Sequence, residues 1–474
     1  METVCDFIVI IIYFAVVLWI GWKGRGKTAE SYWVAGRSYG TSRITMSLVA
    51  TIFGASSTIG IIGLGYRRGL TGAWWSLIGG LFLIPFGLFF AGRVRGSNAY
   101  TLPQILKNAY GDRVSIPAGL MIAVAWCGVI AAQLVAGGRI VCGLFSINFQ
   151  WALFLVAAVF VVYTLVGGQL SVIRTDFWQF FLFGAGLLVA MAFLLFSLYS
   201  DHGHWWRFLP PDHLGFPVAP SFGWYDVLVY YPLIVGLPYL AGPDIYSRTL
   251  CARDDQVAKR AAINAAAIVI PLSFVLALFG LFARVLFSSI AADEALPKVL
   301  QTCVPVGLRG VIAAGFLSAI MSSADTCLIS ASTVLALDVV SPIRCNARIE
   351  SLKITKVAVI LLGLVSWLIA SQEQGIISSL LLAYTVFVGG IVVPTLVSFF
   401  KRELRVTSEA AFWAIVIGGT VAIAGKLYKG ILLKSLLTSQ GQIFLKSILG
   451  PKYLSLLPIL LSALTIVGLS ILRR

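Results

Sequence analysis

The chain has 474 residues, of which 59% are hydrophobic and only 11% are charged. Soluble domains carry roughly 25% charged residues, so this composition excludes a water-soluble globular fold as well as charge-rich coiled coils and solenoids. The net charge of +16 does not indicate a nucleic-acid-binding protein, because the basic residues are scattered in short clusters between apolar runs. The composition predicts an all-α polytopic membrane protein.

Cysteine and histidine are too few and too scattered to suggest a metal site or a disulfide framework. The chain has seven Cys and three His, and no two cysteines form a C-x-x-C pair. Most of the cysteines lie in apolar runs, where Cys behaves as a small buried residue. No nucleophile–base pair is evident either. We therefore expect neither an enzyme nor a protein with an organic cofactor.

Thirteen apolar runs are close to the length of about 20 residues that a membrane-spanning helix needs. They occupy residues 4–22, 44–64, 70–92, 115–145, 149–166, 176–199, 224–241, 261–287, 309–340, 355–371, 377–399, 411–427 and 453–471. The first run has no basic segment before it and no small-residue cleavage site after it, so we interpret it as a span rather than a signal peptide. The sequence therefore predicts about 13 transmembrane helices.

Basic residues are distributed unevenly over the connectors between these runs. Alternate connectors, starting with 23–43, contain 23 of the 35 Lys and Arg residues. Cytoplasmic loops carry this excess, so we expect a plasma-membrane protein with its N-terminus outside and its C-terminus in the cytoplasm. Five lysines on the opposite side share one late connector: Lys426, Lys429, Lys434, Lys446 and Lys452. The connector 426–452 is either an interfacial amphipathic segment or a region where the helix assignment is wrong.

One extra span before ten core spans fits a transporter made of two five-helix inverted repeats. On this plan the chain is one membrane transport domain over 1–474, with an extra N-terminal helix and loop at 4–40, repeats at 41–200 and 201–400, and two C-terminal helices at 401–474. In such proteins the first helix of each repeat is broken near the middle of the bilayer, where its backbone groups face a ligand.

Both predicted first helices contain residues that interrupt a helix. The run 44–64 carries Gly54-Ala55-Ser56-Ser57, and its counterpart carries Pro232, Gly236-Leu237-Pro238 and Gly242-Pro243. Interruptions at matching positions of two halves indicate a substrate site. The alternative is that Gly and Pro are simply frequent in membrane helices.

The segment GFLSAIMSSADTCLISAST at 315–333 gathers small and hydroxyl residues on one helical face. At about 100° per residue, this face is about 100° wide. It contains Gly315, Ala319, Ser322, Ser323, Thr326, Ser330 and Thr333. The face is either a packing surface for a neighbouring helix or an oxygen-lined wall for a hard cation. Asp325 favours the second interpretation, because an ionisable group at membrane depth marks a functional pathway by default.

Several motifs, in order, resemble those of one known family. They are SYWVAGR at 31–37, SLVATIFGASSTIG at 47–60, GGQLSVIRTDFWQ at 167–179 and SAIMSSADTCL at 318–328. These resemble the segment after the first helix and the first, fifth and eighth core helices of the sodium/solute symporters, the family of the bacterial proline, pantothenate, sialic acid and galactose symporters. The stretch YSRTLCARDDQVAKRAA at 246–262 is similar to the family's cytoplasmic connector after the sixth core helix. The resemblance covers nearly the whole chain and implies a leucine-transporter-like fold and sodium-coupled solute import by alternating access.

The resemblance also implies an ion site. In the family a sodium ion lies between the first and eighth core helices. The matching positions here are the carbonyls of Ala50, Phe53 and Ala319 and the hydroxyls of Ser322 and Ser323. Independently of the family, Ala319, Ser322 and Ser323 share one helical face at i, i+3 and i+4.

Two aspartates are expected on the ion pathway. The family has an aspartate at the position of Asp176, near the cytoplasmic exit of the ion, and Asp325 lies beside the hydroxyl face. An alternative for Asp176 is that it caps a helix, because Thr175-Asp176 precedes an apolar run.

The resemblance further implies a central substrate cavity. Ser56, Ser57, Gln133 and Tyr384 are the polar residues expected to face it, although each could instead make an interhelical hydrogen bond. The first break reads Gly-Ala-Ser-Ser where galactose symporters place amide and acidic side chains, which disfavours a sugar. We expect an amino acid, a monocarboxylate or a pantothenate-like solute. A solute carboxylate could bind the N–H groups at the start of a broken helix.

Two other functions remain open. Asp176 and Asp325 could serve a proton in a proton-coupled carrier of the same fold, or the carrier could be uncoupled. The second alternative is a membrane sensor that binds a solute without transporting it. The chain stops at Arg474 directly after the last span, so we expect no output domain. The expected partners are Na⁺ as coupling ion, a small-molecule solute and the lipid bilayer. We expect no nucleic acid and no obligatory protein partner.

Overall fold

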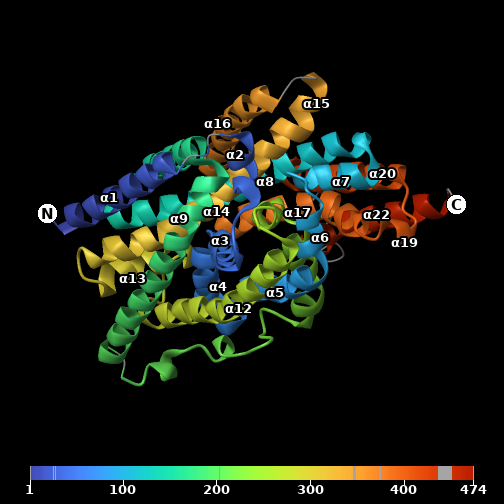
Figure 1. Ribbon diagram of the computed structural model, residues 1–474. Helices are drawn as coiled ribbons and strands as arrows, with labels where there is room; N and C mark the ends of the chain where they lie inside the picture. The colour runs from blue at the N-terminus through green and yellow to red at the C-terminus, as the bar shows by residue number, and fades with distance from the viewer. Residues whose placement is uncertain are drawn as a thin grey trace.

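The computed structural model describes residues 2–24, 26, 28–201, 203–344, 348–372, 375–435 and 451–472. Over these residues the chain is helical, apart from connectors and two isolated β-bridges. The helices form an elongated bundle in which the first and last helices lie at opposite ends (Figure 1). A helix satisfies its backbone hydrogen bonds within itself, which is what an apolar chain in lipid requires.

The helices of the first half are α1 (Glu2–Lys23), α2 (Ala29–Val34), α3 (Thr41–Ile52), α4 (Ile61–Arg68), α5 (Trp74–Pro85), α6 (Ala91–Gly96), α7 (Leu102–Tyr110), α8 (Ser115–Phe145) and α9 (Phe149–Asp201). Those of the second half are α10 (Leu237–Ala241), α11 (Pro243–Thr249), α12 (Asp255–Leu286), α13 (Ala295–Cys303), α14 (Leu308–Val334), α15 (Ser341–Arg344), α16 (Arg348–Gln372), α17 (Ile376–Phe387), α18 (Val393–Ser398), α19 (Lys401–Leu404), α20 (Ser408–Ser435) and α22 (Pro451–Leu472). Short π-helical turns join several of them, including η2 (Ser56–Gly60) and η9 (Pro232–Gly236).

Nine helical stretches of the described residues are long and apolar enough to cross a membrane. The expected number of about 13 is not confirmed. Two pairs of expected runs are each joined in one helical stretch, and the runs 224–241 and 453–471 correspond to shorter helical segments among the described residues. α9 has 53 residues, which is about 80 Å at the helical rise and more than twice the thickness of the bilayer core. Gly168, at φ 61° and ψ −174°, interrupts α9. The expected runs 149–166 and 176–199 are therefore two segments that meet at a kink.

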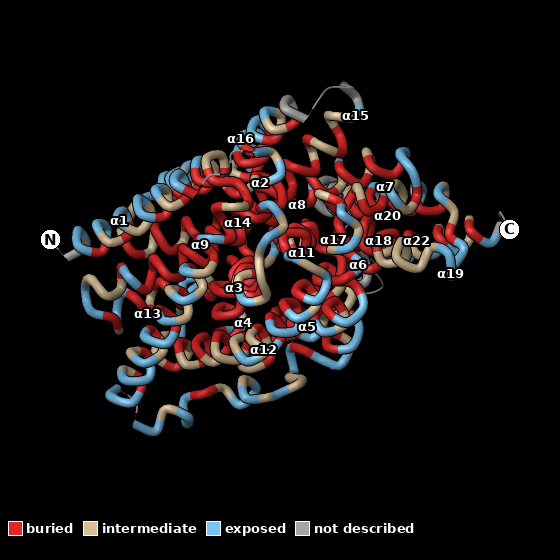
Figure 2. The backbone as a smooth tube through the Cα atoms, in the orientation of Figure 1, coloured by how far each residue is buried: buried red, intermediate tan, exposed pale blue. Residues whose placement is uncertain are grey.

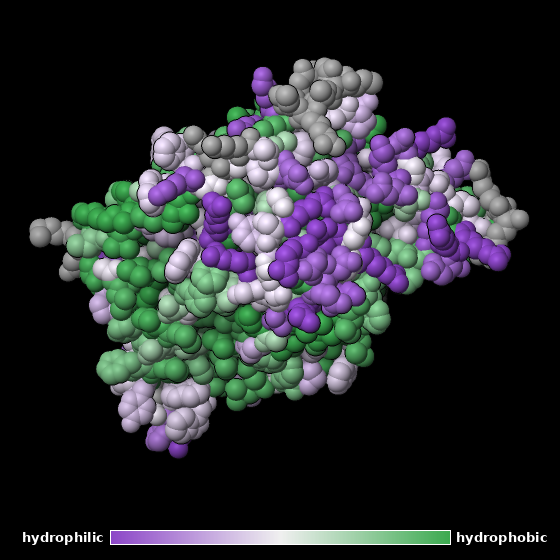
Figure 3. Space-filling model, in the orientation of Figure 1, coloured by the Kyte–Doolittle hydropathy of each residue, from purple (hydrophilic) through white to green (hydrophobic). Residues whose placement is uncertain are grey.

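α14 is the central helix of the bundle. Its residues from Gly310 to Val334 are buried, Val311 excepted, and Figure 2 shows this helix surrounded by others. Peripheral helices carry exposed apolar side chains, such as Ile12 on α1 and Leu361 on α16. In Figure 3 apolar surface extends over the left and lower parts of the molecule, and hydrophilic residues gather toward the right of the view. An apolar surface next to a polar one is what a bilayer-embedded protein requires.

The first predicted interruption is confirmed at Phe53. This residue leaves helical geometry, at φ −80° and ψ 46°, directly after α3. The chain becomes helical again in the π turn Ser56–Gly60. A helix that ends leaves the carbonyls of its last turn without helical partners. The N–H of Phe53 donates to the carbonyl of Val49 at 2.9 Å, and the carbonyl of Ala50, one residue later, has no partner within α3.

The second predicted interruption is confirmed at Gly242. This residue is extended, at φ −63° and ψ 129°, between the end of α10 and the start of α11. Pro243 suits the first position of the new helix, because its missing N–H would have no helical partner there. The two interrupted helices touch, since Arg248 Nε on α11 donates to Thr51 Oγ1 on α3 at 3.1 Å. The division of the chain into inverted repeats stays a prediction.

The N-terminal helix α1 is held by one buried aspartate. Asp6 Oδ1 accepts hydrogen bonds from the backbone N–H groups of Gly307 at 2.8 Å and Gly310 at 2.9 Å. Arg309 also pairs with this carboxylate. A negative charge is favourable at the start of a helix, where N–H groups lack helical partners. Asp6 thereby fastens α1 to the first turn of α14.

Asp176 does not cap a helix, so this alternative is wrong. It lies inside α9, eight residues after the kink at Gly168. The helix resumes directly after the kink, which places Asp176 beyond the positions where a cap acts.

The lysine-rich connector 426–452 lies largely outside the described residues. α20 continues to Ser435, further than the expected run 411–427, and α22 begins at Pro451. Both interpretations of the connector stay predictions.

Candidate functional site

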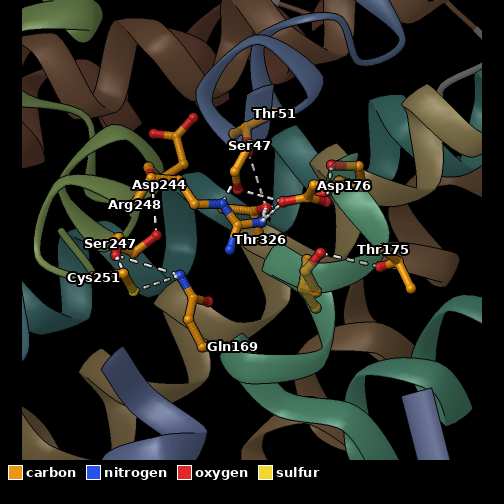
Figure 4. A network of polar contacts seen from close by, with 12 residues as sticks. Ser47, Thr51, Gln169, Thr175, Asp176, Asp244, Ser247, Arg248, Cys251 and Thr326 are labelled. Carbon is orange, nitrogen blue, oxygen red and sulfur yellow. Dashed lines mark hydrogen bonds and ion pairs between the residues drawn. The ribbon is translucent and has the colours of Figure 1, made fainter. Parts of the chain in front are cut away.

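A buried ion pair joins α9 to α11 inside the bundle. Asp176 Oδ2 lies 3.1 Å from Arg248 Nη2, and neither side chain is exposed. Two hydroxyls complete the surroundings of the carboxylate: Ser322 Oγ donates to Oδ1 at 2.6 Å, and Ser47 Oγ donates to Oδ2. We call Asp176, Arg248, Ser47 and Ser322 the Asp176 junction; the first three are labelled in Figure 4. The junction ties together α9, α11, α14 and α3.

Arg248 and Ser47 are the two members of the junction that the sequence analysis did not indicate. The motif at 246–262 predicts a cytoplasmic connector, and this is wrong for Arg248, which is fully buried on α11. Its guanidinium also donates to the hydroxyls of Thr51 and Thr326. The Gly242-Pro243 break could have indicated this from the sequence, because a helix that begins again at Pro243 places Arg248 inside the bundle.

Asp325 lies on α14, three residues after Ser322, and contacts α9 at a different place. Thr164 Oγ1 donates to Asp325 Oδ1 at 2.8 Å. The second carboxylate oxygen, Oδ2, is buried and has no hydrogen-bond partner among the described residues. A buried oxygen of this kind is unfavourable unless a cation or a proton satisfies it. A place for Asp325 on an ion pathway fits this geometry and stays a prediction.

The hydroxyl residues of α14 divide into two kinds. Thr326 Oγ1 donates to the carbonyl of Ser322 at 2.7 Å, and Ser330 Oγ donates to the carbonyl of Thr326 at 2.6 Å. Such bonds engage a hydroxyl within its own helix. Ser323 differs, because its hydroxyl makes no hydrogen bond to the described part of the chain and lines a cavity instead. The face is therefore only partly a packing surface.

The predicted sodium ligands lie where the break after α3 meets α14. The break is so close to Ser323 that a Cβ on Gly54 would collide with the serine Oγ. Thr51 Oγ1 and Thr326 Oγ1 lie 3.2 Å apart across the same interface. The carbonyl of Ala50 is released at this point by the end of α3.

The chemistry of this donor set fits Na⁺. Every predicted ligand atom is an oxygen, which a hard cation prefers to nitrogen or sulfur. Ser322 already donates its proton to Asp176, and its oxygen keeps lone pairs that can face a cation. Among the described residues no group of three or more His, Cys, Asp or Glu forms a transition-metal site. The set of Ala50, Phe53, Ala319, Ser322 and Ser323 stays a prediction.

A small cavity of about 30 Å³ lies beside this interface. All four residues expected at the substrate site line it: Ser56, Ser57, Gln133 and Tyr384. Ser323 lines it as well, so residues of the predicted ion and solute sites face one space. A volume of this size has room for only a few water molecules, so we expect the helices around the cavity to move apart when an organic solute binds.

Gln133 also makes an interhelical hydrogen bond, which was the alternative interpretation of this residue. Its Oε1 accepts a hydrogen bond from the N–H of Ala55 at 2.7 Å. The Gln133 side chain on α8 thus satisfies the N–H of Ala55, which has lost its helical partner at the break. Binding of solute by Gln133, Ser56, Ser57 and Tyr384 stays a prediction.

Asp244 is an acidic residue of the cavity that the sequence did not indicate. It stands on the first turn of α11 and lines the cavity. In Figure 4 its carboxylate points away from Asp176. Asp244 thus places an acidic side chain at the start of α11. The hypothesis that a solute carboxylate binds N–H groups at the start of a broken helix stays a prediction.

A second cavity, of about 10 Å³, lies further along α14. Ser323 and Cys327 line the first cavity, and Ser330 and Val334 line the second. The four residues follow one another at i, i+4, i+7 and i+11, which is one face of a helix. The two cavities therefore follow one another along α14, although Ile329 and Thr333, which also line the second cavity, lie off this face.

Comparison with known proteins relates most of the chain to membrane transporters. The model of the sodium:solute symporter family matches residues 32–418. "Sodium/glucose cotransporter 4" of Mus musculus is 26% identical, over 88% of this chain and 68% of that protein. "Sodium/myo-inositol cotransporter 2" of Oryctolagus cuniculus is also 26% identical, over 87% of this chain and 68% of that protein. These names describe transporters and not enzymes.

Solved structures share the fold. A Na⁺-coupled sialic acid symporter, described in its substrate-bound outward-open state, matches with a TM-score of 0.77 at 19% identity, covering 99% of this chain and 98% of that chain. A transporter of the nucleobase-cation-symport-1 family matches with a TM-score of 0.56 at 14% identity, covering 93% of each chain. At such identities these matches concern the arrangement of helices alone.

Proposed function

We propose, from the premise that this chain belongs to the sodium:solute symporter family, that it is a sodium-coupled secondary active symporter that imports a small organic solute by alternating access. The proposed solutes are an amino acid, a monocarboxylate or a pantothenate-like molecule, taken up across the plasma membrane with the N-terminus of the chain outside. The protein is a multi-pass membrane transporter, and the names of its relatives describe sodium cotransport.

One observation carries the proposal: Ser323 belongs to the predicted ion set and lines the predicted solute cavity. Gly54, at the break, lies against both Ser323 and Gln133, since a Cβ there would lie 2.6 Å from Gln133 Oε1. An ion bound between the break and α14 would hold these two elements together. It would thereby fix the positions of Ser56 and Ser57, which follow the break and face the cavity.

Coupling requires that sodium bind more tightly to the conformation that binds solute. A ligand with equal affinity for both conformations shifts neither, however tightly it binds. By linkage, solute must raise sodium affinity by the same factor. Ser323 belongs to the predicted ion set and also lines the solute cavity, so it can couple the binding of sodium to the binding of solute.

Import also requires a route to the second side of the membrane. The two cavities along α14 are candidate stations of this route, and movement of one group of helices relative to another would open the route to each side in turn. At 100 mV, inside negative, each positive charge carried inward contributes about 2.3 kcal/mol. A sodium gradient can therefore drive solute accumulation.

The test is solute uptake into proteoliposomes that contain the purified protein. The panel comprises amino acids, amines, monocarboxylates, pantothenate, sialic acid, urea and, because of the relatives' names, glucose and myo-inositol. We expect an inward sodium gradient to drive accumulation of at least one member, and collapse of that gradient to abolish it.

The coupling ion is identified in the same vesicles. A pH gradient without sodium should drive no uptake; uptake under these conditions would support a proton-coupled carrier through Asp176 and Asp325. Uptake that equilibrates without accumulation would indicate an uncoupled carrier. Saturable solute binding with no uptake under any gradient would favour the sensor.

A further inference from the structure

Asp244 is a charged side chain in the predicted solute cavity that neither the ion set nor the Asp176 junction uses. No ion pair joins it to a Lys, Arg or His in the described part of the chain. Arg248, one turn further along α11, directs its guanidinium at Asp176, Thr51 and Thr326 (Figure 4). The carboxylate of Asp244 therefore has no counter-charge in direct contact.

The aromatic residues of the cavity suit a cation. Trp126, Tyr239 and Tyr384 line it from three different helices, α8, α10 and α17. The face of an aromatic ring attracts a positive charge, most strongly away from water. Within the described ranges no Lys or Arg lies over these three rings, whereas Arg68 lies 4.3 Å from the centre of the Phe222 ring elsewhere. The three rings are thus available to an incoming cation.

The same cavity is unfavourable for a purely anionic solute. Its described lining residues include no Lys, Arg or His. An anion would bring a second negative charge next to Asp244 in a place of low dielectric, and both charges would lose hydration. The hydroxyls of Ser56 and Ser57 and the amide of Gln133 offer neutral hydrogen bonds to the remainder of a solute.

We infer that the solute carries a positive charge on a protonated or quaternary amino group, with Asp244 as its counter-ion and the rings of Trp126, Tyr239 and Tyr384 around it. The inference rests on the proposed function and narrows it. Among the proposed solutes it selects the amino acid, and it extends the class to simple amines. Asp244 is then the residue that decides specificity, while sodium binds at the neighbouring break.

Matched solutes that differ only in this charge provide the test. L-alaninamide and L-lactamide share a skeleton and exchange an ammonium group for a hydroxyl, and choline and 3,3-dimethylbutan-1-ol exchange a quaternary nitrogen for carbon. Transport currents are recorded from proteoliposomes on a solid-supported membrane in an inward sodium gradient. In at least one pair, we expect the half-saturating concentration of the cation to be at least about tenfold lower than that of its neutral partner. For the ammonium group the reason is a hydrogen bond between charged groups, and for the quaternary nitrogen it is attraction to the carboxylate and the aromatic rings.

The outcomes separate the inference from the proposed function. Sodium-driven currents with hexoses, lactate or the neutral partners, at equal or lower half-saturating concentrations than the cations, would leave symport intact and overturn the inference. The absence of sodium-driven current with every solute of the panel would overturn the proposed function and the inference with it.

The variant Asp244→Asn tests the residue itself, because it removes the charge and keeps the shape. We expect the preference for the cation over its neutral partner to fall at least about tenfold, with an unchanged sodium half-saturation, and Asp244→Glu to restore part of the preference. Asp338→Asn, a buried carboxylate that bonds Ser115 away from the cavity, should keep the full preference. Size-exclusion profiles establish that each variant is folded. A raised sodium half-saturation with unchanged preference would assign Asp244 to the inorganic ion and overturn the inference.

Discussion

Asp176 and Asp244 are two acidic side chains inside the same bundle, and their surroundings differ in kind. Asp176 has the guanidinium of Arg248 at 3.1 Å and accepts hydrogen bonds from two serines. Asp244 has no such partner and faces a cavity. Polar groups of a stable core are satisfied by their neighbours, whereas an unmatched charge at membrane depth is a place for a ligand. Burial alone thus does not distinguish a carboxylate that the protein itself satisfies from one that is open to a ligand; the partners of the carboxylate do. The predicted place of Asp176 on the ion pathway stays a prediction.

The largest expected effect comes from removing the counter-charge of the junction. Arg248→Ala leaves Asp176 buried and unpaired, and we expect a loss of about 3–5 kcal/mol in the free energy of unfolding. The measurement is thermal or chemical unfolding of the purified protein in detergent. Arg253→Ala is the control, because the Arg253–Asp254 pair is exposed and such pairs contribute about 0–1 kcal/mol.

The double variant Asp176→Leu/Arg248→Met sharpens this prediction. It removes both charges, and replacing a buried pair by apolar residues is often neutral for stability. We expect it to recover most of the stability that Arg248→Ala loses. An Arg248→Ala protein as stable as the original would mean that the junction is not the satisfied structural unit described above.

The second largest effect is expected from filling the break after α3, which lies between the Asp176 junction and the cavity that Asp244 lines. Gly54→Val places a side chain where even a Cβ would lie 2.6 Å from Gln133 Oε1. Overpacking of this kind costs about 1–3 kcal/mol of stability, and here it would also fill the cavity, so solute-dependent transport should be lost. Gly184→Val is the control, since nothing lies within 4 Å of a Cβ there. Transport by Gly54→Val at the original rate would contradict the placement of the cavity.

Substitution of two neighbouring serines tests where the Asp176 junction ends and the cavity begins. Ser322 belongs to the junction and Ser323 to the cavity, and both belong to the predicted ion set. Loss of either hydroxyl should raise the sodium half-saturation about fivefold, the equivalent of about 1 kcal/mol. Only Ser322→Ala should also lower the unfolding free energy, by about 1.5–3 kcal/mol, because it removes a hydrogen bond to a charged group.

The control for both serine variants is Ser332→Ala. Ser332 is buried on the same helix and donates to the carbonyl of Ile329 at 3.1 Å, so sodium dependence should not change. If sodium half-saturation stays constant in Ser322→Ala and Ser323→Ala alike, the ion set is wrong.

The smallest effect concerns the tyrosine of the cavity. Tyr384→Phe keeps the ring and removes the hydroxyl, so we expect the solute half-saturation to change by about fivefold or less, with sodium half-saturation unchanged. Tyr110→Phe removes a hydroxyl that bonds the carbonyl of Pro394, away from the cavity, and should change neither value. A complete loss of transport in Tyr384→Phe would show that the hydroxyl, and not the ring, is the important group.

Local residue patterns predicted several parts of the site correctly. The Gly-Ala-Ser-Ser and Gly-Pro segments predicted both breaks, because these residues disfavour a continuous helix wherever they stand. The positions Ser56, Ser57, Gln133 and Tyr384 were placed on one cavity from the resemblance and do line it. The number of spans was not obtained, because hydropathy does not distinguish a kinked double segment such as α9 from two separate helices.

The two most informative charged residues were missed for one reason. Arg248 belongs to a stretch with several basic residues that predicts a cytoplasmic connector, and Asp244 stands just before it. Hydropathy averages over a window, so a short helix that re-enters the bundle after a break looks like the loop that follows it. The seven-residue α11 is too short to produce an apolar signal of its own.

The sequence by itself determined that this chain is a helical membrane protein, that two of its helices are broken, and which oxygen-bearing residues share a face of α14. These properties depend on residues close together in the chain, where helical geometry relates position to direction. The tertiary structure decided which polar groups meet. Asp176 bonds Ser47, 129 residues away, and Ser322, 146 residues away, and these partners take up the charge of Asp176. Asp244 stands four residues before the same arginine but lines the cavity. The packing of α11 against α3 and α14 determines where each of these side chains finds a partner.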